Sequence, residues 1–218
     1  MRRVALLAVS IALVTCAASA AQTGNLDQMP LPRSELGPGT AALTLAPGSG
    51  VVSNAYAAHD AGHGYTAADL TRLGRITGYE LDYVLPNASV PQTQRRLLGV
   101  QTIAELYRDR ATAQGGLTFW SGVTRRLSGH QANGDSVAVA AFQAHVGDGS
   151  FAYELTYRQR GQTLYDVGDI VFRSGSLLGA VFVSATDAAG LRTRTLQLAH
   201  NLVSRMKRVQ ARQAAARD

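Results

Sequence analysis

The chain has 218 residues, of which 46% are hydrophobic and 17% are charged, and its formal net charge is +6 at neutral pH. This composition is typical of a globular protein and excludes a disordered chain, which would be more charged and less apolar. The single cysteine excludes an internal disulfide, so the fold must depend on its hydrophobic core.

The N-terminal residues have the order of charge and hydropathy that a secretory signal peptide requires. Arg2 and Arg3 precede an uncharged stretch, 4–21, that ends in small residues. We therefore predict a signal peptide over 1–20 and an exported protein. An uncleaved anchor is a third, less favoured reading, because 18 uncharged residues fall short of the roughly 20 that a spanning helix needs.

Two processing routes compete for this leader. Ala18 and Ala20 fit the small-residue rule for cleavage after Ala20, which gives a secreted or periplasmic product. Alternatively, the run Leu13-Val14-Thr15-Cys16 resembles a lipobox, and lipidation of Cys16 gives a membrane-anchored lipoprotein. Cleavage after Ala20 is favoured, since Thr15 stands where a lipobox normally has Gly, Ala or Ser.

The region after the leader is rich in glycine and proline, which predicts a linker over 21–50 with a short strand at 41–45. A single domain is expected over 51–210, followed by a flexible tail at 211–218. Loss of the leader lowers the net charge to +4, which favours anionic membrane or wall surfaces as partners.

Local patterns predict three elements in the first half of this domain. Thr66 and Asp69 form a capping box, which predicts a short helix. The alternation of apolar and polar residues over 76–85 predicts a strand. The run 97–103 is ambiguous, because Thr102 could cap a helix and the β-rich residues could equally form a strand. A strand is favoured, since a better helix pattern follows it.

The second half predicts two helices and a run of strands. Apolar residues at helical spacing over 113–127 indicate an amphipathic helix. A last helix is expected to begin at a cap, Asp187, and to carry an inward stripe as far as Val209. Glycine-containing turns between the two helices separate four strand candidates of an antiparallel meander, at 137–144, 151–158, 164–173 and 177–184.

This element order predicts an α+β fold. The predicted sheet has one apolar face and each helix has one apolar stripe. Packing the helices against the sheet in two layers is the simplest way to bury both. We expect an antiparallel sheet of about six strands packed on one face by two helices, with a long C-terminal helix.

The segments Gly74-Arg75-Ile76-Thr77-Gly78-Tyr79, Val146-Gly147-Asp148 and Asp169-Ile170-Val171-Phe172-Arg173-x-Gly175 resemble pieces that recur in exported bacterial proteins. Together with the element order, they make the region of about 76–209 similar to PsbP/Mog1-like domains. That resemblance implies an antiparallel sheet backed by helices and an exported lipoprotein or secreted protein of unknown activity. It supplies no catalytic residue.

Three motifs suggest chemistry but lack the surroundings that the chemistry needs. His59 and His63 are spaced like a helical metal site, yet Gly62 and Gly64 favour a loop and no third ligand is evident. The run 62–67 matches a dinucleotide fingerprint without a preceding strand. Ser204-Arg205-Met206-Lys207 matches a serine-nucleophile motif whose partner motifs are missing. We therefore expect no catalytic residue, no metal and no cofactor.

Five tyrosines on predicted strands are the remaining candidates for a binding site. A tyrosine offers flat apolar area with a polar tip, so these side chains could line a ligand groove on an open sheet face. The five are Tyr79, Tyr83, Tyr153, Tyr157 and Tyr165.

The sequence therefore favours a non-enzymatic, exported domain that binds a small ligand or a protein at the cell envelope. The alternative is an envelope hydrolase whose site is assembled from residues distant in sequence. Nucleic acid is not expected as a partner, because the basic residues over 192–217 lack interleaved aromatics and instead complement the end of a helix.

Overall fold

The structure is a computed structural model that describes residues 25–86, 96–130 and 135–216. The predicted signal peptide, with Cys16 and Ala20, lies outside these residues. No helix within the described ranges is long and apolar enough to cross a membrane.

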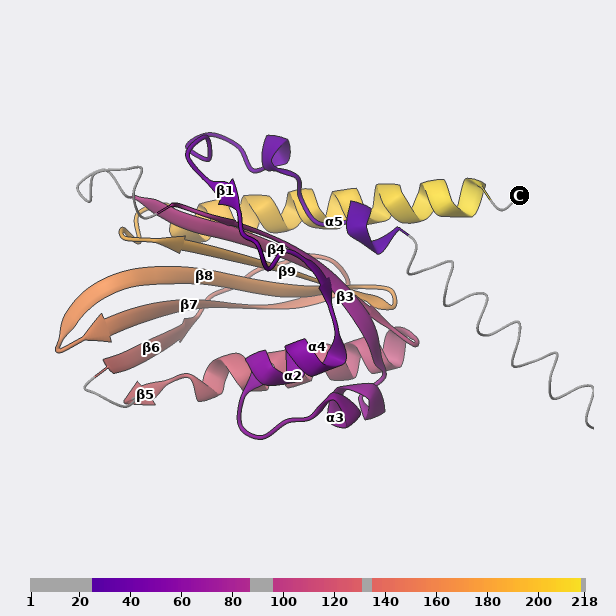
Figure 1. Cartoon of the computed structure of the whole chain (residues 1–218), viewed down its shortest axis with the longest axis horizontal. Coiled ribbons are helices and arrows are strands. Elements are labelled where there is room, and N and C mark those ends of the chain that lie inside the picture. The colour runs from indigo at the N-terminus through magenta and orange to yellow at the C-terminus, as the bar shows by residue number, and fades with distance from the viewer. Residues whose placement is uncertain (1–24, 87–95, 131–134, 217–218) are drawn as a thin grey trace, which may run out of the picture.

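The fold is α+β, as predicted, and is built on one antiparallel sheet (Figure 1). The sheet runs in the order β1-β3-β4-β9-β8-β7-β6-β5, and β2 also pairs with β3. β6 to β9 form the expected meander, and β9 returns to pair with β4. The strands are β1 (Thr44–Leu45), β2 (Gly50–Val52), β3 (Arg75–Val84), β4 (Leu97–Tyr107), β5 (Gly129–His130), β6 (Asp135–Ala141), β7 (Gly149–Gln159), β8 (Gln162–Ser174) and β9 (Leu177–Ala185).

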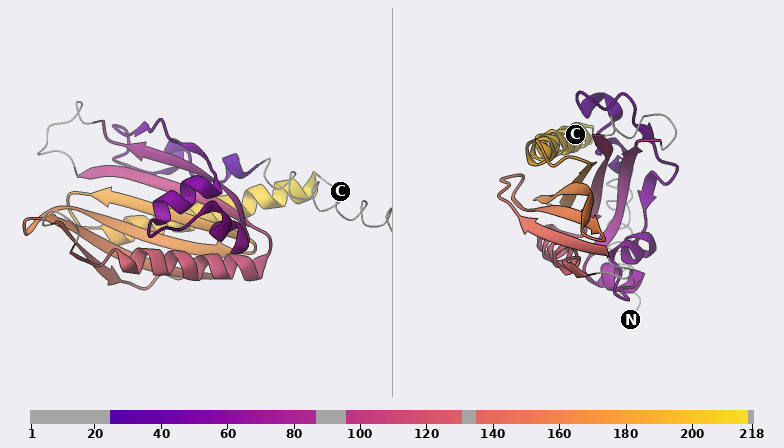
Figure 2. Two further views of the ribbon diagram at one scale, coloured as in Figure 1. Left: turned by 60° about the horizontal axis from the view of Figure 1, so that its bottom comes forward. Right: turned by 90° about the vertical axis from the view of Figure 1, so that its left-hand side faces the viewer.

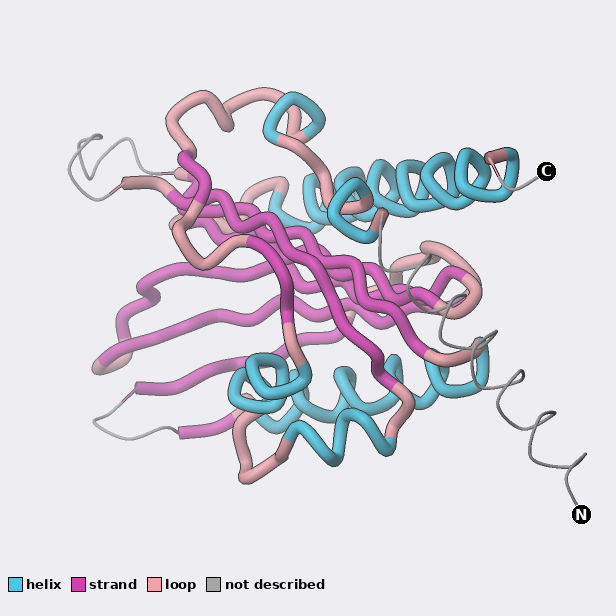
Figure 3. The backbone as a smooth tube through the Cα atoms, turned by 45° about the vertical axis from the view of Figure 1, so that its right-hand side comes forward, coloured by secondary structure: helices cyan, strands magenta, loops and turns pink. Residues whose placement is uncertain are grey.

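Helices cover both faces of this sheet. The long C-terminal helix lies on one face, and the other three α-helices lie on the opposite face (Figures 1 and 3). The end-on view in Figure 2 keeps α5 and α4 apart, with strands between them. The helices are η1 (Leu26–Gln28), η2 (Arg33–Glu35), α2 (Asn54–Ala61), α3 (Ala67–Arg72), α4 (Arg110–Arg126) and α5 (Leu191–Ala215).

This arrangement differs from the expected single covered face. Alternate residues of β9 divide between two cores: Val181 and Val183 pack with α5, whereas Ala180 and Phe182 pack with α4. A strand that is apolar on both faces must be covered on both, so two helices on one face would leave half of its apolar side chains in water. In the described residues the sheet has nine strands instead of about six. β1 corresponds to the short strand expected at 41–45 and joins the sheet, whereas β2 and β5 are too short to show a pattern.

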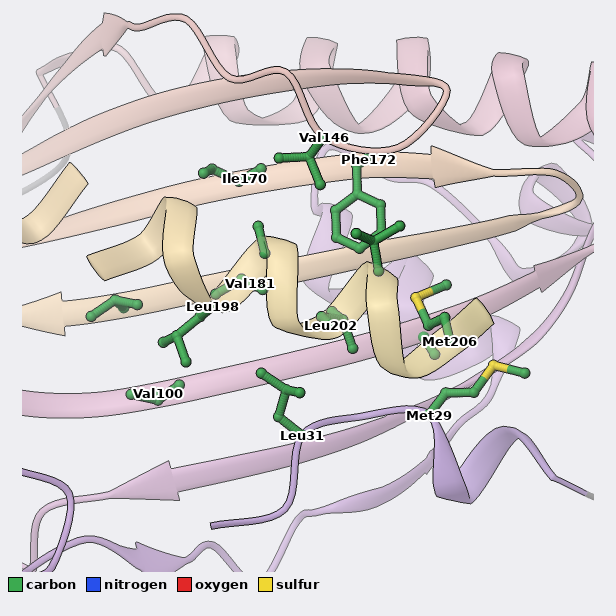
Figure 4. Close-up of a cluster of buried hydrophobic side chains, with 14 of the residues drawn as sticks. Met29, Leu31, Val100, Val146, Ile170, Phe172, Val181, Leu198, Leu202 and Met206 are labelled. Atoms are coloured by element: carbon green, nitrogen blue, oxygen red, sulfur yellow. The ribbon is translucent and has the colours of Figure 1, made fainter. Parts of the chain in front are cut away.

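The segment expected to be a linker is part of the core from residue 26 onward. Its apolar side chains pack beneath α5, where Figure 4 shows Met29 and Leu31 beside Leu202 and Met206. The backbone N–H of Leu31 donates to the Thr102 hydroxyl of β4 at 3.1 Å. Glycine and proline here shape an irregular path across the sheet, and the apolar residues between them are buried: Leu26, Met29, Leu31, Leu36 and Leu43.

α5 approaches the sheet closely because β8 has a glycine beneath it. A Cβ at Gly168 would collide with the Thr195 side chain of the helix. The helix begins at Gly190, which has a left-handed conformation with φ of 75°. Asp187, expected as the cap, accepts instead from the Ala189 N–H at 2.8 Å within the preceding turn. The start of α5 therefore has no side-chain cap.

Three further local predictions agree with the structure. α3 begins with the expected capping box, in which Thr66 and Asp69 bond reciprocally. The ambiguous run after residue 96 is a strand, β4, and the helix expected near 113–127 is α4. A second capping box, made by Asp109 and Thr112, fixes the start of α4. Local hydrogen bonds thus set both helix starts on the face opposite α5.

Candidate functional site

A cavity of about 240 Å³ lies on the face of the sheet that α2 and α4 cover. β3, β4, β8 and β9 form its floor, and the two helices form its walls. Most of the lining is apolar: Val52, Ala57, Ile103, Trp120, Val123, Leu127, Val171, Leu178, Gly179, Ala180 and Phe182. The polar lining consists of Asp60, Glu80, Gln101, Glu105 and Thr124.

One carboxylate of the lining, Glu105, has a complete set of partners. Its Oε1 accepts from Arg75 Nε at 2.8 Å, and its Oε2 accepts from the Tyr107 hydroxyl and from Trp120 Nε1, both at 3.0 Å. Arg75 and Glu105 are both buried. A buried ion pair whose remaining lone pairs are hydrogen-bonded is rigid, so this network fixes the Trp120 indole in the cavity wall.

The local sequence provides for this network in two ways. Glu105 and Tyr107 are two residues apart on β4 and therefore project from the same face. A glycine at position 78 leaves the space that the guanidinium fills, since a Cβ there would lie 2.7 Å from Arg75 Nη2. Arg75 also donates to Asn54 Oδ1 at 2.7 Å, which connects the network to the first turn of α2.

A second group of carboxylates lies on the β3 and α2 side, where Glu80 and Asp60 line the cavity and Asp82 lies near Glu80. Glu80 is only 3% exposed, and its Oε2 accepts from Gln101 Nε2 at 3.1 Å. Burial, with repulsion from Asp82 and Asp60, raises the pKa of Glu80 to about 7. Burial likewise raises the pKa values of Asp60 and Asp82. Within the described chain, none of these three carboxylates forms a salt bridge, in contrast to Glu105.

Asp169 lies next to the cavity, behind the α4 residue Thr124. It is completely buried, and Thr124 donates to its Oδ2 at 2.9 Å, whereas its Oδ1 has no hydrogen-bond partner. Burial raises the pKa of Asp169 to about 7, and the Thr124 hydrogen bond opposes this shift. No salt bridge of the described chain involves Asp169, so its burial favours the neutral form.

Among the described residues, the lining contains no histidine, serine, cysteine, lysine or arginine, and its titratable groups are carboxylates. In the described ranges, no group of three histidine, cysteine, aspartate or glutamate side chains could hold a metal ion.

The five predicted tyrosines do not meet in one groove. Tyr79 and Tyr83 belong to the core around α5, where the Tyr83 hydroxyl accepts from the backbone N–H of Arg33 at 3.0 Å. Tyr153 lies on the opposite face, with its hydroxyl 3.1 Å from Ser121 Oγ of α4. Tyr157 and Tyr165 stack on each other with ring centroids 4.6 Å apart. None of the five lines the cavity, so their role in binding stays a prediction.

The sequence reading missed the helix that closes the cavity. The His59–His63 segment was expected to be a loop, but His59 and Asp60 lie in the last turn of α2. Ser53 accepts from the Tyr56 N–H as the N-cap, and Gly62 ends the helix. The sequence signal for α2 consists of Ser53, an N-cap residue, and Gly62, a helix-ending glycine. They stand at the two ends of an alanine-rich run.

The segments that carry the family resemblance have structural roles. Arg75 and Gly78 belong to the Glu105 network. The other two segments contact each other: Asp148 Oδ2 accepts from Arg173 Nη1 at 3.2 Å and from the Gly175 N–H at 3.0 Å. The backbone amide of Gly175 is the larger cause, and Arg173 a smaller one, of the lowered pKa of Asp148.

Comparison with known proteins gives a structural likeness alone. No family model matches the chain, and no curated protein matches it in sequence. Among solved structures, it is similar to the extracellular domain of PknH from Mycobacterium tuberculosis, with a TM-score of 0.55 and 9% identity. The match covers 83% of this chain and 95% of that one. At this identity the likeness shows a shared fold, and the PsbP/Mog1-like resemblance stays a prediction.

Proposed function

We propose that this chain is an exported, non-enzymatic domain that binds a small ligand in the cavity between α2, α4 and the sheet. One observation carries the proposal: a largely apolar cavity whose wall is already held in place by the Arg75–Glu105–Trp120 network. Binding sites are typically such concave, preformed and mostly apolar spaces with a few placed polar groups.

The size of the cavity sets the size of the ligand. An apolar cavity of roughly 150 Å³ holds a benzene molecule. At about 240 Å³, this cavity has room for an aromatic ring with a short side chain. We therefore propose a ligand of about that size, bound at the cell envelope.

Two features support the exported location. The leader has the charge and hydropathy of a signal peptide. The solved domain with the same fold is described as extracellular, and we extend that location to this chain as part of the proposal. Mass spectrometry of the native N-terminus tests it. Ala21 as the first residue is expected, a lipid-modified Cys16 would place the domain on a membrane, and an intact Met1 in a cytosolic fraction would overturn the export.

Ligand binding is tested through the only tryptophan of the chain, Trp120, which lies in the cavity wall. Titration with the neutral probe 2-phenylethanol should change its fluorescence in a saturable way. Ala180→Leu, which fills the cavity, should weaken this binding, and Ala138→Leu, at an exposed position on β6, should not. Equal binding by both variants would place the ligand elsewhere.

A further inference from the structure

We infer that the ligand of this cavity is a small organic cation, with a protonated amine at Glu80 and an aromatic or aliphatic body against Trp120 and Phe182. This inference rests on the proposed function, since it concerns the same cavity. It follows from a difference between Glu80 and Glu105, the two buried carboxylates of the cavity lining.

The Glu105 end of the cavity is electrically balanced. Its carboxylate is paired with Arg75 and accepts two further hydrogen bonds, so no acceptor site on it needs a ligand. An amine at this end would have to compete with a buried guanidinium. The ligand's charge is therefore not expected here.

The Glu80 end is unbalanced. Glu80 lines the cavity with 3% of its surface exposed, and the hydrogen bond that it receives comes from a neutral amide, Gln101. Asp82 on the same strand and Asp60 on α2 add negative charge. No lysine or arginine of the described chain forms a salt bridge with any of the three.

A buried carboxylate is stabilised either by a proton or by a paired cation, and a cationic ligand group would be such a partner for the ionised form of Glu80. A ligand ammonium group that reaches Glu80 would relieve the repulsion among the three carboxylates. An anionic ligand would add to that repulsion. The mostly apolar remainder of the lining requires that the rest of the ligand be apolar, since hydrated polar groups would lose their water there.

The groups around Glu80 set the pH dependence of binding. Tyr56 and Asp60 face it from α2, Asp82 lies beside it on β3, and Gln101 contacts it from β4. With its pKa at about 7, Glu80 is half ionised at neutral pH, and a bound cation favours the ionised form. Cation affinity should therefore rise about tenfold from pH 6 to pH 8, and binding at pH 7 should release about half a proton.

The test compares three probes that share a phenyl ring and differ in charge. They are 2-phenylethylammonium, neutral 2-phenylethanol and anionic 3-phenylpropanoate, each titrated at pH 8 and followed by Trp120 fluorescence and calorimetry. We expect the ammonium probe to bind at least tenfold more tightly than the alcohol, and the carboxylate to bind more weakly than either.

Two variants assign the preference to Glu80. Glu80→Gln keeps the shape of the side chain and should abolish the preference for the ammonium probe while leaving binding of the alcohol within twofold. Glu154→Gln makes the same charge change at the Arg192 ion pair, outside the cavity, and should leave the preference intact. Asp60→Asn, on the more exposed α2 side of the cavity lining, should reduce the preference by a smaller factor.

The outcomes separate this inference from the proposed function. If the alcohol binds as tightly as the ammonium probe, or if Glu80→Gln keeps the preference, the cation assignment is wrong and ligand binding stands. If none of the three probes changes the Trp120 signal or produces heat, both proposals fail.

Discussion

Trp120 of α4 donates its indole N–H to the Glu105 carboxylate of β4, at 3.0 Å, and thereby joins the helix to the buried ion pair beneath it. The same carboxylate holds Arg75, which in turn bonds to Asn54 of α2. One glutamate therefore connects the sheet to both helices that wall the cavity.

Glu105→Gln should destabilise the protein strongly, because it leaves the Arg75 charge buried without a counter-charge. Loss of one partner of a buried pair costs about 3–5 kcal/mol in the free energy of unfolding. Glu154→Gln, at the exposed Arg192 pair, should cost less than about 1 kcal/mol. Urea unfolding of both variants measures the difference, and similar costs would mean that the buried pair does not stabilise the fold.

Two adjacent glycines in α4 should respond to alanine with opposite signs. A Cβ at Gly115 would make an ordinary 3.5 Å contact with Leu73 Cδ1, so Gly115→Ala should stabilise the helix by about 1 kcal/mol. A Cβ at Gly116 would lie 2.5 Å from the Tyr107 ring, whose hydroxyl is bonded to Glu105. Gly116→Ala should therefore destabilise the protein by about 1–3 kcal/mol. Thermal unfolding distinguishes them, and shifts of the same sign would contradict the packing of α4 on Tyr107.

The packing of the N-terminal segment predicts that Leu31 contributes to stability as a core residue does. Leu31 is fully buried, whereas Leu45 of β1 is 52% exposed. Leu31→Ala should lower the free energy of unfolding by about 2–5 kcal/mol. Leu45→Ala should change it by less than about 0.5 kcal/mol. A small effect at both positions in urea unfolding would support a linker instead of a core segment.

Asp169 should make stability depend on pH. Burial raises its pKa to about 7 in the folded protein, from an ordinary value of 3.8. Between these values the unfolded chain loses the proton and the folded chain keeps it. The stability contributed by the neutral group is therefore complete below about pH 4 and is lost as the pH rises through 7.

Asp169→Asn removes this proton and keeps an acceptor for the Thr124 hydroxyl. Relative to the wild type, the variant should gain stability on the order of 3 kcal/mol between pH 4 and pH 8. Urea unfolding at a series of pH values gives this difference. A difference that stays constant with pH would mean that Asp169 is already ionised in the folded protein.

Local patterns in the sequence predicted most of the elements. The meander of β6 to β9 follows from alternating residues between glycine turns, and α3 follows from its Thr66–Asp69 capping box. Such signals are short-range, because each depends on residues that touch within one turn of helix or one hairpin. The face to which an element packs is a long-range property, and there the expectation of two helices on one face did not agree with the structure.

The cavity could not be predicted for the same reason. The alternation in β3 correctly separates Tyr79 and Tyr83 from Glu80 and Asp82, but it indicates a solvent-facing acidic side. α2 covers that side of the sheet. Its sequence is rich in alanine, so its two faces differ too little in hydropathy to predict a helix with one buried face. The pattern alone therefore gives no sign that Glu80 lines a cavity.

The folded domain begins only a few residues after Cys16, and this short separation limits how far a lipidated product could lie from the membrane. Only eight residues lie between Cys16 and Asn25, which precedes Leu26, the first buried side chain of the described residues. A fully extended chain over these nine residue steps reaches about 30 Å. In a lipid-modified product, the start of the folded domain would therefore lie no more than about one bilayer thickness from the headgroups. The cleaved product would instead diffuse and sample the whole compartment.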